Sequence, residues 1–158
     1  MDAASLGTLR TELSGDPAGL GYQGLSDAQA ADALNARTRP GKQPVPASEV
    51  RRYVLLNGLW PGLQNLAANG TDPVQKGTAL TILQTLAPNS FDSIRMNDPA
   101  VAAAVTQMLQ TMVDAGVMTA AHRDAMVALG DAQVSRAEEL GLGHVHHIDV
   151  AEARSGNQ

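Results

Sequence analysis

Apolar residues recur every three or four positions along most of this chain, which is the spacing of one face of an α-helix. In the first run, Leu6, Leu9 and Leu13 share a face. The run stops at Gly15-Asp16-Pro17, because the residue before a proline is displaced from the helical region of backbone conformation. The pattern therefore predicts one short amphipathic helix at the start of the chain.

Capping residues indicate where further helices begin, since their side chains can accept hydrogen bonds from the first free backbone amides. Ser26 has Gln29 three positions later, which is the arrangement of a capping box. It predicts a helix that runs to about Ala36. Ser48 and Thr119 precede two more apolar runs and predict helices there.

Two Asp-Pro pairs predict the longest helices. In each pair the carboxylate can cap the helix and the proline suits its first position. The expected helices cover residues 73–86 and 99–115, and Gly116 is placed to end the second. The second helix carries an apolar stripe made of Val101, Val105, Met108, Leu109, Met112 and Val113.

Shorter apolar runs complete the pattern. They predict a helix that reaches Ala68, another around 134–140 that Gly141 ends, and a final turn or two over 148–154. A short strand near 144–148 is the one extended segment that the pattern suggests. The expected fold class is all-α, as a small bundle of short helices.

Residues 37–46 contain three prolines and three basic residues, a composition typical of a solvated and extended connector. This proline-rich connector would separate an N-terminal helical arm from the rest of the chain. We therefore expect an arm and connector over residues 1–46 and a helical core over residues 47–158.

The composition narrows the possible functions. Eleven basic residues against 16 acidic residues give a formal charge of −5, which offers little attraction for a phosphate backbone, so nucleic acid is not an expected partner. The absence of cysteine excludes disulfides, thiolate metal sites and a cysteine nucleophile. No secretory signal begins the sequence, and no apolar run approaches the ~20 residues of a membrane span. We expect synthesis in the cytoplasm and no membrane association.

The sequence contains few candidate catalytic or metal-binding residues. His144 and His146 are the one metal-like pair, because alternate residues of an extended backbone share a side. A polar loop whose histidines meet solvent or backbone is the simpler interpretation. His122, Arg123 and Asp124 are neighbours on a predicted helix and so face different directions. We therefore expect no enzyme activity, no cofactor and no bound metal.

Methionine and tryptophan leave two interpretations open. Four methionines could form an adaptable partner surface, or they could fill a core that has one Phe, one Trp and two Tyr. Core filling is favoured for them, and also for Trp60, which could otherwise be an exposed interface anchor. The four methionines are Met108, Met112, Met118 and Met126.

The two ends of the chain carry motifs that resemble a known class of proteins. The first end reads Leu-Arg-Thr-Glu-Leu at 9–13, followed by Asp-Pro at 16–17 and Leu-Gly-Tyr at 20–22. The last reads Ser-Arg-Ala-Glu-Glu-Leu-Gly-Leu-Gly at 135–143. Together they are similar to short proteins of uncharacterised function that tailed bacteriophages encode among their structural genes. The likeness covers roughly the first 36 and last 25 residues.

This resemblance implies a structural subunit of the virion, in the tail or the head–tail neck. Its partners would be other phage structural proteins, and it would be a homo-oligomer or a subunit docked in a ring. Residues 1–36 are expected to contact neighbours, with Leu9, Leu13, Tyr22 and Trp60 as apolar anchors. An arm on a tether gains affinity for an adjacent subunit.

Three alternatives remain open. The chain could be a tail-assembly chaperone or adaptor that is absent from the mature particle. It could decorate the capsid, which would require hundreds of copies. It could also be a small metal-dependent enzyme centred on His144 and His146.

Overall fold

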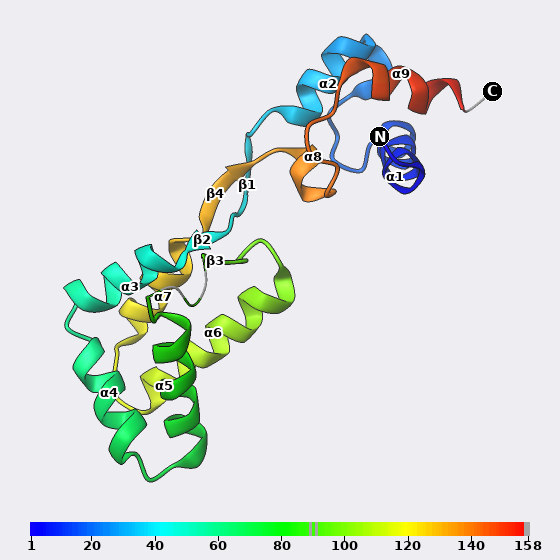
Figure 1. Cartoon of the computed structure of the whole chain (residues 1–158). Helices are drawn as coiled ribbons and strands as arrows, with labels where there is room; N and C mark the ends of the chain where they lie inside the picture. Colours follow the sequence, from blue (N-terminus) through cyan, green and yellow to red (C-terminus); the bar gives the residue numbers. More distant parts are fainter. Residues whose placement is uncertain (89, 91, 157–158) are drawn as a thin grey trace. The chain divides into compact units, whose positions relative to one another are not determined.

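The computed structural model describes residues 1–88, 90 and 92–156 (Figure 1). Among these residues it contains nine α-helices and two pairs of short strands. The chain is thus largely helical, but it is not purely all-α as expected. Strands β1 (Arg39–Lys42) and β2 (Val45–Pro46) lie in the segment expected to be a solvated connector, and they pair with β4 (Asp131–Val134) and β3 (Ser93–Ile94) respectively.

The first and last segments of the chain belong to the same compact unit. This terminal unit comprises Met1–Gly41 and Gln133–Gln158, and the central unit comprises Lys42–Ala132. The structure thus divides the chain differently from the expected arm over 1–46 and core over 47–158. The physical reason is that apolar side chains from both ends are buried in one core.

Helices from the two ends pack together in the terminal unit. From the N-terminal side come α1 (Ala3–Gly15) and α2 (Asp27–Asn35), with a short 3-10 turn at Tyr22–Gly24 between them. From the C-terminal side come α8 (Arg136–Glu139) and α9 (His147–Ser155). Helix α9 packs against both α1 and α2, and α8 packs against α2. The buried core consists of Leu9, Leu13, Tyr22, Ala30, Ala31, Leu34, Ala137, Val145, Val150 and Ala153.

Local hydrogen bonds fix the loops of the terminal unit. Asp16 adopts a left-handed backbone conformation with φ 42°, and its carboxylate accepts hydrogen bonds from the amides of Leu20 and Gly21 at 2.8 and 2.7 Å. Asn35 exchanges two hydrogen bonds with the backbone of Val145, at 2.7 and 3.0 Å. The end of α2 is therefore tied directly to the segment that leads into α9.

The central unit is a separate helical assembly. It contains α3 (Ala47–Leu56), α4 (Trp60–Asn69), α5 (Pro73–Thr85), α6 (Pro99–Asp114) and α7 (Ala120–Ala128). Helix α4 packs along α5, and α6 packs against α5 and α7. Its buried core consists of Val54, Leu59, Leu63, Ala79, Ile82, Leu86, Leu109, Met112, Met118 and Met126.

Most of the predicted caps are confirmed. The Ser26 capping box with Gln29 is present, and Asp72, Asp98 and Thr119 cap α5, α6 and α7 through their side chains. The short strand expected near 144–148 is not formed, because α9 begins at His147. Within the described residues, no helix combines the length and the apolar character needed to cross a membrane.

Candidate functional site

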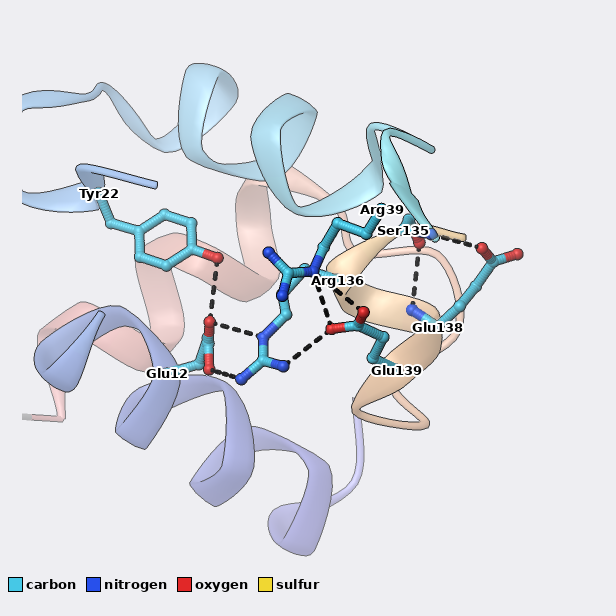
Figure 2. Close-up of polar contacts among 7 residues, drawn as sticks. All are labelled: Glu12, Tyr22, Arg39, Ser135, Arg136, Glu138 and Glu139. Atoms are coloured by element: carbon cyan, nitrogen blue, oxygen red, sulfur yellow. Dashed lines mark hydrogen bonds and ion pairs between the residues drawn. The ribbon is translucent and has the colours of Figure 1, made fainter. Parts of the chain in front are cut away.

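The carboxylate of Glu12 lies at the centre of a polar cluster that joins the two end motifs (Figure 2). Its side chain is 2% exposed. It accepts hydrogen bonds from Nε and Nη2 of Arg136 at 2.9 and 2.8 Å, and from the Tyr22 hydroxyl at 3.2 Å. A two-pronged arginine contact of this kind is among the strongest pairings available to a buried carboxylate. The charge of Glu12 is therefore matched inside the terminal unit.

The cluster continues outward through Glu139. Its carboxylate accepts hydrogen bonds from Nη1 of Arg136 at 2.9 Å and from Nε of Arg39 at 3.0 and 3.1 Å. Figure 2 shows Arg39 and Arg136 both pointing toward this carboxylate, with Glu12 on the opposite side of the Arg136 guanidinium. Arg136 thus lies between two carboxylates, one buried and one partly exposed.

A capping box starts α8 next to the cluster. The amide of Ser135 donates to Oε2 of Glu138 at 2.8 Å, and the amide of Glu138 donates to the Ser135 hydroxyl at 3.1 Å. Arg37 forms an ion pair with the other oxygen of Glu138. Each polar residue of the stretch Ser135–Glu139 therefore either starts α8 or pairs with the N-terminal segment.

The surroundings raise the pKa values of Tyr22 and Arg136 and lower those of Glu138 and Glu139. Burial, together with the charge of Glu12, raises the pKa of the Tyr22 hydroxyl well above its ordinary value, so it stays protonated and donates. Hydrogen bonds to Glu12 and Glu139 raise the pKa of Arg136. The Ser135 amide and then Arg37 lower the pKa of Glu138. Burial alone would raise the pKa of Glu139, but hydrogen bonds from Arg136 and Arg39 outweigh it and lower that pKa.

Two further arginines join the ends of the chain. Nε of Arg10 donates to the Ala153 carbonyl at 3.1 Å, near the end of α9. Nη2 of Arg154 donates to the Tyr22 carbonyl at 2.7 Å, and its Nη1 donates to the Leu25 carbonyl at 3.1 Å. Each terminal segment therefore satisfies backbone carbonyls of the other, which fixes how the two segments associate.

The contacts of this polar cluster stabilise the association of the two ends of the chain. In the described part of the chain, no buried side-chain nitrogen or oxygen lacks a hydrogen-bond partner. Removing either partner of the Glu12–Arg136 pair would leave a charge without its match in a site that water reaches poorly. The arrangement thus holds two distant segments in one register.

The structure places the expected interface anchors differently from the sequence-based prediction. Leu9, Leu13 and Tyr22 are buried in the core of the terminal unit, where they cannot serve as exposed anchors. Trp60 is half-buried and packs against the core of the central unit. The amphipathic pattern identified these residues as apolar contacts but could not tell a core of this chain from a neighbouring subunit.

Two apolar residues of the terminal unit that the sequence did not single out are exposed. Ile148 on α9 is 66% exposed and Met1 is 43% exposed. The N-terminal ammonium lies 3.6 Å from Oδ1 of Asp149, which brings Met1 to the start of α9. We refer to Met1 and Ile148 as the exposed terminal pair. In the sequence, this pair could be suspected only from Ile148, an apolar residue next to Asp149 in the first turn of α9.

The candidate metal ligands His144 and His146 stack edge to face, with ring centroids 4.8 Å apart. Nearby Asp149 accepts a hydrogen bond from the His146 amide at 2.8 Å and thereby caps α9. Among the described residues, the structure contains no group of three His, Asp or Glu side chains placed to hold a metal ion. The two imidazoles thus lack the third protein ligand that a zinc site requires.

Comparisons with protein-family models, curated proteins and solved structures found no match to this chain. The functional interpretation consequently depends on the end motifs and on the geometry of the terminal unit that contains them.

Proposed function

We propose that this chain is a structural subunit of a tailed-phage virion, located in the tail or the head–tail neck, and that it acts through protein–protein contacts. One observation carries the proposal: the two end motifs, which hold the resemblance to phage proteins, fold into the same compact unit. Glu12 of the first motif pairs with Arg136 of the last. The resemblance thus corresponds to one folded module instead of two unrelated fragments.

The terminal unit is the part that docks on the particle. The apolar residues of its first motif are buried in its own core, and we assign the contact with neighbours to the exposed terminal pair, Met1 and Ile148. Single exposed apolar residues are common on protein surfaces. The backbone nitrogen of Met1 lies 3.6 Å from Oδ1 of Asp149, the residue that follows Ile148.

The central unit is an insertion between the two halves of that module. It spans Lys42–Ala132 and has a core of its own, and only helical pattern links it to the resemblance. Such an insertion can vary between related particles without disturbing the docking module, because domain insertion is tolerated where two chain segments lie close together.

Quantitative mass spectrometry of purified particles from an infected host tests the proposal, with this chain counted against the portal and major capsid proteins. We expect a small fixed number of copies per particle, about six or twelve, because a subunit of a closed ring occurs in a number set by the symmetry of that ring. Hundreds of copies would move the chain to the capsid surface or the tail tube. Absence from the particle would contradict the proposal and favour an assembly chaperone or adaptor.

A further inference from the structure

The central unit contains an apolar cavity of about 380 Å³ that is open to the surface. It lies among α3, α5, α6 and the segment around β3 (Ser93–Ile94). The walls are mainly aliphatic and methionine side chains, including Val54, Ile82, Val105, Met108 and Met118. Methionine adapts to irregular shapes, so such walls suit a flexible apolar guest.

Three polar side chains of the lining make no hydrogen bond to another residue that the structure describes. Thr85, Ser93 and Arg95 all line the cavity, and Ser93 and Arg95 are exposed. Within the described residues, none of their side chains forms a hydrogen bond or an ion pair. Among the described residues that line the cavity, Arg95 is the one charged residue.

The size and chemistry of the cavity favour a particular ligand. Sites for small ligands typically measure ~300–1,000 Å³. Apolar cavities hold water poorly and take up apolar molecules instead. A guanidinium beside such a cavity adds a partner for one carboxylate, which it can bind through two parallel hydrogen bonds.

We propose that the central unit binds a medium-chain fatty acid, with the aliphatic chain in the cavity and the carboxylate at Arg95. Ser93 and Thr85 lie in the same lining and supply hydroxyl donors to the second carboxylate oxygen. This site goes beyond the proposed virion role and does not depend on it.

Isothermal titration calorimetry of the delipidated 158-residue chain tests the site, with octanoate, dodecanoate and hexadecanoate as probes. We expect one molecule bound per chain and an affinity optimum at an intermediate chain length, because the cavity has a limited volume. Dodecyltrimethylammonium, which has the same chain and the opposite charge, should bind at least tenfold more weakly. Failure of all three carboxylates to bind would overturn the proposal.

Substitutions at the lining separate specific binding from general surface adsorption. Arg95→Glu should weaken dodecanoate binding at least tenfold, and the variant should bind dodecyltrimethylammonium more tightly than dodecanoate. Because Arg95 is exposed, the fold should tolerate the change. Ala104→Trp should block the cavity, which Ala104 lines. Ala103→Trp is the matched control, because Ala103 is the exposed neighbour on α6 and does not line the cavity.

Equal binding by the Ala104→Trp and Ala103→Trp variants would overturn the proposal, since the guest would then lie elsewhere. The proposal would also fail if dodecanoate did not bind while Ala104→Trp alone lowered the copy number in particles. That result would assign the cavity to a side chain of a neighbouring protein.

Discussion

At the scale of single residues, Glu12 of the first end motif pairs with Arg136 of the last. The two residues are 124 positions apart, so no local pattern could reveal their contact. Ser26, Asp72, Asp98 and Thr119, in contrast, act on amides two or three residues away, and the sequence predicted their roles. Helix caps can therefore be predicted from a short stretch of sequence, whereas an ion pair between distant residues cannot.

Replacing Glu12 with glutamine should destabilise the terminal unit by about 3 kcal/mol, the low end for breaking a buried ion pair, because Arg136 retains some contact with water. Glu139→Gln is the matched control and should cost less than ~1 kcal/mol, since Glu139 is partly exposed. Native-state hydrogen exchange of the amides of α1 and α9 measures both losses. Equal losses in the two variants would contradict the central place of Glu12.

Acidification should weaken the terminal unit in a defined direction. The folded-state pKa values of Glu138 and Glu139 lie below their ordinary value of 4.5, so the unfolded chain binds protons more readily. Their contribution to stability is complete above pH 4.5 and is lost as the pH falls through the lowered values.

Hydrogen exchange of α8 at a series of acidic pH values checks this expectation. The double variant Glu138→Gln, Glu139→Gln should show a shallower decline in protection than the parent protein. Parallel declines would mean that other carboxylates govern the acid response.

At the scale of elements, the sequence predicted helices well and strands poorly. Helix starts and stops depend on nearby caps, prolines and glycines, and these residues can be identified directly in the sequence. Strands β1 and β2 contain Pro40 and Pro46, residues that argue against strands, and their pairing depends on partners about fifty to ninety residues away. Proline is tolerated there because each pair has only two strands, and all of them are edges.

Deleting residues 1–36 distinguishes a detachable arm from a folded half. We expect α9 to lose its protection from hydrogen exchange, because α1 and α2 supply most of its packing surface. The helices of the central unit should keep their protection, since their core lies within Lys42–Ala132. Retained protection in α9 would favour the arm that the proline-rich connector suggested.

At the scale of the whole molecule, the division into units was the least predictable feature. The proline-rich segment predicts a boundary between the first helices and those that follow. It does not show that the chain returns at Gln133 to complete the same unit. That return depends on buried contacts between distant residues, such as Leu9 with the core formed by Val150 and Ala153.

If the chain is a virion subunit that docks through its terminal unit, the number of copies per purified particle should depend on exposed residues of that unit. Wild-type, Ile148→Asp and Leu56→Asp chains would be compared in particles grown without the native copy. Both residues are exposed, at 66% and 74%, so neither change should unfold the chain. Leu56 belongs to the central unit and is the control.

We expect the wild type and Leu56→Asp at the same fixed copy number and Ile148→Asp reduced at least fivefold, because a buried aspartate at a contact costs about 2 kcal/mol or more. Normal incorporation of Ile148→Asp together with loss of Leu56→Asp would contradict docking through the terminal unit. Absence of the wild-type chain from particles would rule out the proposed role in the virion.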